Sequence, residues 1–393
     1  MNRNVVLLLI SRITRSLAAG ALAVVVGLYL VHDVHLSLFQ VGVIFGVGAF
    51  VTPLITFFLG LYSDKYGRKK LLMIALSFLP ISVLILLLTS NFYLLMISSA
   101  LGGFGIAGGL VGGGVGATVA PMQTAILTEN VPPRERTKVF SLFTVLSNYS
   151  GSAGALLAFL QNYREIFALT LALSLVSAIV VVPIKEMYRP RREVKATSEA
   201  DKDVIKKFTL TGILNGVSQG FIVPFIPIIF SEVYKLPQGT IGAVVSVGGI
   251  VSATSMFLTP KLTEAMGFVK LIIATRSVSA VLVLLFPFLA SPMLAMVDYV
   301  AFTTFRIIAL PAQQALMMNL VGEGRRATAT GSNQVGRLVP AAASTSLSGY
   351  LMKAVSLVIP FEVSFVATVV NSYLYYKYFR KVDKATTEVL IAE

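Results

Sequence analysis

Long apolar runs constrain this chain more than any other feature. A run of about 20 apolar residues forms a helix long enough to cross the hydrocarbon core of a bilayer, since each residue adds about 1.5 Å. The chain has 393 residues, of which 56% are hydrophobic and 13% charged, so it is far more apolar than a soluble domain. We therefore predict an all-α integral membrane protein with twelve transmembrane helices. The predicted spans are residues 5–31, 38–62, 71–89, 92–128, 138–161, 166–184, 207–231, 239–260, 271–289, 293–320, 327–351 and 357–379.

The composition also argues against several functions. The chain has no cysteine, so disulfides and thiolate chemistry are excluded. His32 and His35 lie in one short loop and are interpreted as solvated residues rather than a metal pair. No phosphate-binding Gly-rich loop and no nucleophile–base cluster are present, which argues against an ATP-driven pump and an enzyme. We predict no metal site and no cofactor.

Basic residues set the expected orientation. Of the 32 Lys and Arg residues, three fall in loops on the side opposite the termini and four fall inside the predicted spans. The remaining 25 (32 − 3 − 4) fall on the side of the termini or at helix ends that face it. Positive loops stay in the cytoplasm, so we predict a multi-pass protein of the cytoplasmic membrane with both termini cytoplasmic. The net charge of +14 follows from this rule, and no nucleic-acid partner is expected. The three opposite-side residues are Arg164, Lys235 and Lys353.

The two halves of the chain repeat each other. At an offset of 200, Gly20 matches Gly220, and Asp64 to Gly67 match Glu264 to Gly267. At an offset of 190, Gln123 matches Gln313. Two homologous six-helix halves are typical of transporters. We predict a first bundle at residues 1–184, a cytoplasmic linker at 185–206, a second bundle at 207–384 and a cytoplasmic tail at 385–393.

Ten extra residues in the first half are placed within 102–116, where nine glycines suggest either a lengthened helix or an unwound gate.

The charged turn from Gly60 to Lys70, Gly-Leu-Tyr-Ser-Asp-Lys-Tyr-Gly-Arg-Lys-Lys, separates two apolar runs. A weaker copy follows at Pro260–Lys270. Together with the six-plus-six spans and the segment Glu129 to Arg136, this pattern resembles the major facilitator superfamily over nearly the whole chain. The resemblance implies two pseudo-symmetric six-helix bundles around a central cavity that opens alternately to each side.

The resemblance also assigns gating roles to matching positions. Asp64 would cap or pair near the cytoplasmic start of the eleventh helix and stabilise the outward-open state. Arg68 would pair with Glu129 at the end of the fourth helix. In the second half Glu264 is retained but a proline replaces the first glycine, so its role is weaker. The interpretation that these charges merely anchor the loop stays open. The predicted gating residues are Gly60, Asp64, Gly67, Arg68, Glu129, Arg136, Glu264 and Gly267.

Arginines inside the predicted spans carry the substrate hypothesis. Arg12 and Arg15 share one face of the first helix, and Arg306 and Arg337 lie near mid-membrane. Four arginines facing lipid would cost on the order of 10 kcal/mol, so they must face the interior. Either they bind an anionic substrate, because guanidinium groups suit carboxylate and phosphate, or they act as structural locks by pairing with acids or backbone carbonyls. For Arg12 a third alternative stays open, that its side chain extends to the cytoplasmic surface. The candidate charge or coupling partners are Asp33, Asp298 and Glu362.

Other polar residues in the spans are candidates for the same cavity, although each one alone is typical of helix–helix hydrogen bonding. The full set of predicted cavity residues is Arg12, Arg15, Gln123, Asn148, Tyr149, Asn215, Gln219, Arg306, Gln313, Asn333 and Arg337.

Three functions compete. The first is a secondary active transporter of a small solute, with an anion as the favoured class and H⁺ or a counter-ion as a possible co-substrate. The second is a proton-coupled exporter of drugs or lipophilic cations, which needs a carboxylate in the cavity. That hypothesis is weakened because the fifth span reads Asn148 to Ala155 without the closing Gly-Pro of drug–proton antiporters. The third is a non-transporting membrane receptor. We expect a monomer whose other partners are membrane lipids.

Overall fold

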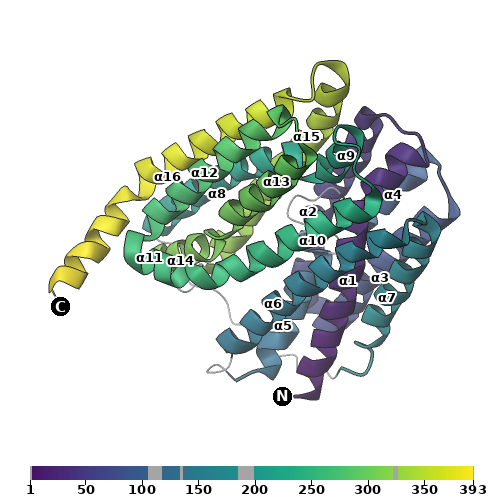
Figure 1. Cartoon of the computed structure of the whole chain (residues 1–393). Helices are drawn as coiled ribbons and strands as arrows, with labels where there is room; N and C mark the ends of the chain where they lie inside the picture. The colour runs from purple at the N-terminus through teal and green to yellow at the C-terminus, as the bar shows by residue number, and fades with distance from the viewer. Residues whose placement is uncertain (1, 105–116, 133–135, 185–198, 322–325, 393) are drawn as a thin grey trace.

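The computed structural model describes residues 2–104, 117–132, 136–184, 199–321 and 326–392, and these residues form helices without any strand (Figure 1). The all-helical prediction is confirmed. The first half contains α1 (Arg3–His32), α2 (Leu38–Tyr66), α3 (Arg68–Leu88), α4 (Phe92–Gly102), η1 (Ala117–Val119), α5 (Ala120–Asn130), α6 (Arg136–Ala155), η3 (Leu156–Leu160) and α7 (Tyr163–Ile179). The second half contains α8 (Glu199–Ile222), η4 (Val223–Phe225), α9 (Ile226–Glu232), α10 (Gln238–Ser255), η5 (Met256–Leu258), α11 (Thr259–Met266), α12 (Phe268–Leu285), η6 (Phe286–Phe288), α13 (Pro292–Ile307), α14 (Leu310–Leu320), α15 (Arg326–Ala354) and α16 (Ile359–Ala392).

Within the described ranges, eight helical stretches are long and apolar enough to cross a membrane. Other predicted spans correspond to helical segments outside that set, such as α4 with α5, α7, α15 and α16. The total of twelve spans therefore stays a prediction, as do the bounds of the two bundles. The predicted linker and the glycine-rich stretch fall mostly on 185–198 and 105–116, which lie outside the described residues.

Prolines divide several of the spans that the sequence analysis treats as continuous helices. The predicted span 207–231 is broken by η4 at Pro224, and 239–260 is broken by η5 just before Pro260. The span 293–320 divides at Pro311, which lies in the first turn of α14. Proline has no backbone N–H and its ring clashes with the preceding turn, so each break follows from the sequence.

The same helix pairs pack together in both halves. In the first half α1 packs against α6 and α7, α3 against α7, and α2 against α4. In the second half the corresponding pairs are α8 with α15 and α16, α12 with α16, and α10 with α13. Between the halves, α2 packs against α15 and α6 against α10. These two contacts also correspond to each other, as expected for pseudo-symmetric bundles.

Glycines at matching positions explain part of this symmetry. Gly67 and Gly267 link α2 to α3 and α11 to α12 with φ angles of 95° and 86°, a region that side chains rarely adopt. A Cβ at Gly20 would lie 1.8 Å from the carbonyl oxygen of Gly151, and one at Gly220 would lie 2.2 Å from that of Ala341. Both repeats therefore need glycine at the turn and at the helix crossing.

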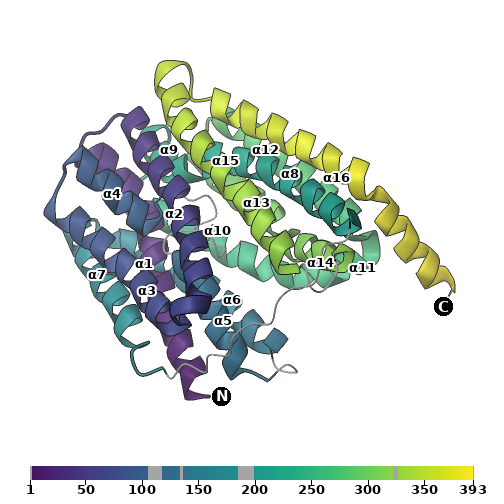
Figure 2. The ribbon, with the colours of Figure 1, turned by 180° about the vertical axis from the view of Figure 1, so that it is seen from behind.

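The two halves meet at the end of the molecule opposite the chain termini (Figures 1 and 2). One apolar cluster joins residues of both halves there, whereas the terminal end has two separate clusters, one in each half. Phe39 of α2 lies edge-to-face on Tyr350 of α15, with 6.0 Å between ring centroids. We call these two regions the opposite end and the terminal end.

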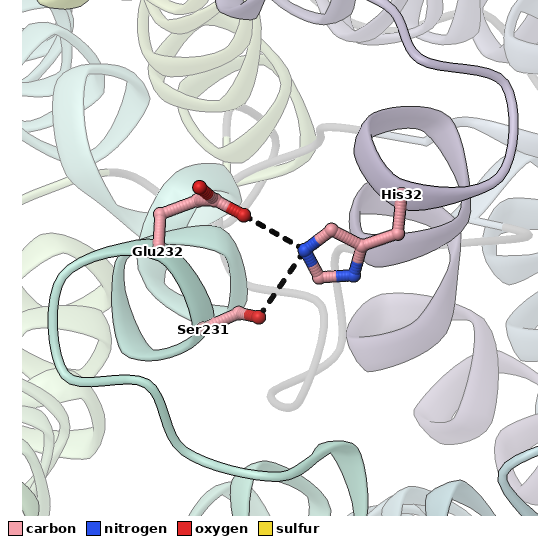
Figure 3. A network of polar contacts seen from close by, with 3 residues as sticks. All are labelled: His32, Ser231 and Glu232. Carbon is pink, nitrogen blue, oxygen red and sulfur yellow. Dashed lines mark hydrogen bonds and ion pairs between the residues drawn. The ribbon is translucent and has the colours of Figure 1, made fainter.

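A polar contact also joins the halves at the opposite end (Figure 3). His32 Nε2 lies 2.8 Å from Glu232 Oε1 and 3.3 Å from Ser231 Oγ. His32 is the last residue of α1 and Glu232 is the last residue of α9, and the two are 200 positions apart. His32 is exposed, as expected of a solvated residue, but it lies at the end of α1 instead of in a loop and pairs with the residue at the matching position of the second half.

Candidate functional site

A pocket lies between the two halves near the middle of the described structure. Its cavity volume is about 140 Å³. A cavity that holds one water has about 10–15 Å³, so this pocket has roughly ten times the space that one water needs. The first half contributes side chains of α1 and α2 and Phe104, which follows α4. The second half contributes residues of α8, η4, α9, α10, α12, α13, α14 and α15. A pocket between two such halves is a typical place for a small-molecule ligand.

Three arginines line this pocket: Arg276 of α12, Arg306 of α13 and Arg337 of α15. Among the described residues no Asp or Glu lines the pocket with them. The predicted positive interior is therefore present, but with a different set of cations. Arg276 was missed by the sequence analysis, although it lies inside the predicted span 271–289. With it, five basic residues lie in the interior of spans, and 24 (32 − 3 − 5) remain on the side of the termini or at helix ends that face it.

Arg276 is held firmly by its surroundings. Its Nη1 donates to Asn371 Oδ1, its Nη2 donates to Gln313 Oε1 at 2.6 Å, and its guanidinium carbon lies 4.7 Å from the centre of the Tyr375 ring. Hydrogen bonds and a cation–π contact together fix the plane of the guanidinium. The predicted cavity residue Gln313 thus positions an arginine instead of lining the pocket.

Arg306 and Arg337 make fewer and longer hydrogen bonds than Arg276 does. Arg306 Nη2 donates to Ser218 Oγ at 3.4 Å, and Arg337 Nη1 donates to Gln219 Oε1 at 3.4 Å. A guanidinium has five N–H donors. Within the described part of the chain these are the hydrogen bonds that the two side chains make, and each leaves four donors (5 − 1) for a ligand or water.

Asn215 and Gln219, predicted to share a face of one helix, both line the pocket and are joined by a 3.2 Å hydrogen bond. Four of the eleven predicted cavity residues therefore line it: these two, Arg306 and Arg337. Whether any of the eleven binds substrate stays a prediction.

The arginines of the first helix have local partners. Arg12 Nε donates to Ser147 Oγ at 2.9 Å, and Arg15 Nη2 lies 3.4 Å from Gln123 Oε1. Gln123 Nε2 in turn donates to the carbonyl oxygen of Leu8 at 3.1 Å. These side chains join α1 to α5 and α6 and do not line the pocket.

The remaining predicted cavity residues also lie elsewhere. Asn148 is buried in α6, and the hydroxyl of Tyr149 lies 3.0 Å from Thr254 Oγ1 across the contact between the halves. Asn333 Nδ2 donates to the carbonyl oxygen of Phe208 at 2.5 Å and joins α15 to α8. None of the three is a lining residue of the pocket.

The predicted acidic partners do not pair with the pocket arginines. Asp298 of α13 is buried, with 7% of its surface exposed, and its Oδ2 has no hydrogen-bond partner among the described residues. Glu362 is exposed in the first turn of α16, and Asp33 is exposed at the end of α1. No ion pair shown by the described residues joins these acids to Arg276, Arg306 or Arg337. In the part of the chain that the structure describes, no acid–arginine pair holds the pocket together.

The gating residues are described only in part. Arg68 Nη1 forms an ion pair with Glu129 Oε1, joining the start of α3 to α5, as the family resemblance implies. Glu264 is exposed on α11. The side chains of Asp64 and Arg136 and the surroundings of Gly60 lie outside the described residues. The gating roles stay predictions. In the described ranges, no group of three or more His, Cys, Asp or Glu residues is placed to hold a metal ion.

Comparison with known proteins agrees with this architecture. Residues 8–345 match the family model of the Major Facilitator Superfamily. A stretch of 171 residues is 28% identical to MFS transporter L2 of Phoma sp., a match that covers 42% of this chain and about a quarter (26%) of that relative's length. The fold is similar to the crystal structure of the nucleoside transporter NupG, with a TM-score of 0.75 at 11% identity, covering 96% of this chain and 100% of that one. It is also similar to the human organic anion transporter MFSD10 (TETRAN), with a TM-score of 0.68 at 11% identity, covering 95% and 99%. The family model covers most of the chain, so this protein belongs to the major facilitator superfamily.

Proposed function

We propose that the protein is a secondary active transporter that moves a small anion across the cytoplasmic membrane by alternating access. The observation that carries the proposal is the pocket with three arginines and no acidic lining residue among the described residues. The family supports transport rather than enzymatic catalysis. The name of one structural neighbour, an organic anion transporter, agrees with a cationic pocket.

Electrostatics favours an anionic substrate over a neutral one. Removing a cation from water costs several kcal/mol unless a partner restores the lost interactions. Three guanidinium groups that share one pocket also repel each other. An anion bound among them supplies the missing opposite charge and accepts the N–H donors that Arg306 and Arg337 leave unused.

The packing supports a specific state of the transport cycle. The terminal end is the cytoplasmic end if basic loops face the cytoplasm. A large apolar cluster joins the halves at the opposite end, and a small one joins Ala49 of α2 to Leu338 and Ala342 of α15. At the terminal end each half has its own cluster. This arrangement favours a state that is closed to the outside. Transport would then require α2 to separate from α15, and α6 from α10, at the opposite end.

The proton-coupled exporter of lipophilic cations has less support. Such an exporter needs a carboxylate where the cation binds, and the pocket lining offers arginines instead. Asp298 precedes the lining residue Tyr299 but does not itself line the pocket. As a buried carboxyl with a free oxygen, Asp298 is our candidate for binding a coupling proton rather than a cationic drug.

A thermal-unfolding screen of the purified protein tests the proposed substrate class. Organic and inorganic anions, sugars and lipophilic cations are added to the wild type and to a variant that carries both Arg306→Gln and Arg337→Gln. We expect anions to raise the unfolding temperature of the wild type but not that of the variant. The stabilising anion is then tested in proteoliposomes, where we expect the wild type to exchange it across the membrane. Arg380→Gln is the matched control, because Arg380 is exposed on α16. Stabilisation by lipophilic cations alone would overturn the proposal in favour of the exporter.

A further inference from the structure

The two halves of the chain contribute different kinds of side chain to the pocket. The second half contributes both apolar residues, such as Val245, Phe302 and Ile307, and polar ones. The charged and hydrogen-bonding residues of the pocket all come from the second half of the chain, among the described residues that line it. They are Asn215, Gln219, Ser252, Arg276, Tyr299, Thr303, Arg306 and Arg337. The first half contributes Leu22, Ala23, Val26, Phe45 and Phe104, which are all apolar.

A second, smaller cavity extends the polar side further into the second half. Its volume is about 10 Å³, close to the space needed by one water. Arg276 and Arg306 line both cavities, and Ser279, Thr368 and Asn371 add hydrogen-bonding groups to the smaller one. The polar region therefore continues away from the apolar wall.

The two sides of the pocket suit different parts of one ligand. The guanidinium donors of Arg306 and Arg337 suit the oxygens of a carboxylate, sulfonate or phosphate. The opposite wall, with the rings of Phe45 and Phe104, offers no hydrogen bond to a small hydrated anion. An inorganic anion would leave this wall in contact with trapped water, whereas an apolar body would displace that water.

We propose that the substrate is an organic anion with an aromatic or bulky aliphatic body. Its anionic group binds among the arginines of the second half, and its body lies against α1 and α2 of the first half. This inference rests on the proposed anion transport through the same pocket and adds the substrate class. It makes Phe45 and Ala23 specificity-determining residues that select the body of the substrate, while the arginines select its charge.

The chain offers a direct optical test because it has 14 tyrosines and no tryptophan. Energy transfer from tyrosine to an indole ring reports binding of indole-3-acetate to the purified full chain. Indole-3-acetamide has the same ring without the charge, and acetate has the charge without the ring. Acetate, inorganic phosphate and indole-3-acetamide are measured as competitors of indole-3-acetate.

We expect indole-3-acetate to bind about 10- to 100-fold more tightly than acetate or phosphate, from the apolar area of one ring removed from water. The neutral amide should be weaker by about 10-fold or more, because it lacks the charge-assisted hydrogen bonds. Ala23→Leu fills space at the apolar wall and should weaken indole-3-acetate while leaving competition by acetate unchanged. Phe45→Ala should act in the same direction, and Phe50→Ala on the same helix is the control, since Phe50 is exposed.

The outcomes separate the two proposals. If acetate and phosphate bind as tightly as indole-3-acetate, and Ala23→Leu and Phe45→Ala change neither affinity, the organic-anion inference is overturned while anion transport stands. If indole-3-acetate and its amide bind equally and Arg306→Gln has no effect on either, the arginines do not bind anions. The proposed function then fails together with the inference.

Discussion

Replacing Arg306 by glutamine distinguishes an arginine that binds substrate from one that locks the fold. Arg306 makes one hydrogen bond in the described structure, a 3.4 Å contact from Nη2 to Ser218 Oγ. Ser218 Oγ also lies 2.9 Å from Ser364 Oγ and 2.7 Å from Thr368 Oγ1. Ser218 therefore keeps hydrogen-bond partners when the guanidinium is removed.

The expected loss of affinity follows from the chemistry of the lost contacts. A hydrogen bond to a charged group contributes about 1.5–3 kcal/mol when its partner is left unpaired in a buried site. Each 1.4 kcal/mol corresponds to a factor of ten in affinity. We therefore expect Arg306→Gln to weaken anion binding by about 10- to 150-fold.

Unlike the affinity, the free energy of unfolding should hardly fall when Arg306 is replaced by glutamine. Breaking a buried ion pair by removing one partner costs about 3–5 kcal/mol, because the other charge is left alone. Arg306 has no acidic partner in the described structure, and its removal relieves the repulsion from Arg276 and Arg337. We therefore expect the free energy of unfolding without substrate to stay within about 1 kcal/mol of the wild type or to rise.

Two reference variants make the comparison quantitative. Arg276→Gln removes the donor to Asn371 and Gln313, and each buried acceptor left unsatisfied costs about 1–3 kcal/mol. That variant should unfold at a clearly lower temperature, whereas Arg380→Gln should match the wild type in both stability and binding. Thermal unfolding and equilibrium binding of indole-3-acetate are measured on all four proteins in the same detergent. If Arg306→Gln lowers stability as much as Arg276→Gln and leaves affinity unchanged, Arg306 is a structural lock and the reasoning is refuted.

Three further predictions concern the movement of the halves. A side chain at Gly349 would place its Cβ 2.4 Å from a backbone oxygen of α2. Gly349→Val should therefore open the opposite end. In this cysteine-free chain the opening is measured as increased labelling of single cysteines introduced at that end. Gly331→Val is the control, since a Cβ there meets nothing within 4 Å, and equal labelling of both variants would contradict the prediction. His32→Ala and Glu232→Gln should each favour the state open at the opposite end. A double-mutant cycle should give a coupling free energy of about 0.2–1 kcal/mol between the two residues. A coupling of zero would show that their contact does not stabilise the closed state. Asp64→Asn should favour the state open at the terminal end, seen as greater labelling of reporters at that end, and unchanged labelling there would remove Asp64 from the gate.

The fold could be predicted largely from the sequence because its signals are local or regularly spaced. Apolar runs of bilayer length identify helices, and the offset of 200 identifies the repeat, which the matching turns at Gly67 and Gly267 confirm in structure. The breaks at Pro224 and Pro311 were predictable from proline chemistry but were overlooked, because hydropathy alone does not register them. The pairing of His32 with Glu232 was not predictable from local pattern, since it depends on how the two halves are closed.

The candidate site was predicted less completely because depth in the membrane does not say which way a side chain points. Arg15 and Arg306 both lie within apolar helices, yet Arg15 lies against Gln123 inside the first half and Arg306 lines the central pocket. A buried amide beside an arginine satisfies the guanidinium locally without bringing it to the pocket. Only the packed structure shows which arginines keep donors for a ligand.

Matching positions in the two halves do not contribute equally to the pocket. Gln123 and Gln313 occupy matching positions, and each accepts from an arginine. The arginines, however, come from non-matching helices, Arg15 from α1 and Arg276 from α12. The glutamine has the same role in both halves, but the arginine that donates to it stands on a different helix in each. Only the arginine of the second half, Arg276, lines the pocket. Alternating access needs the halves to match in backbone packing, but it places no such demand on their side chains. Among the described lining residues, one half supplies all the charged groups and the other supplies only apolar side chains. A substrate with an anionic group and an apolar body fits this division.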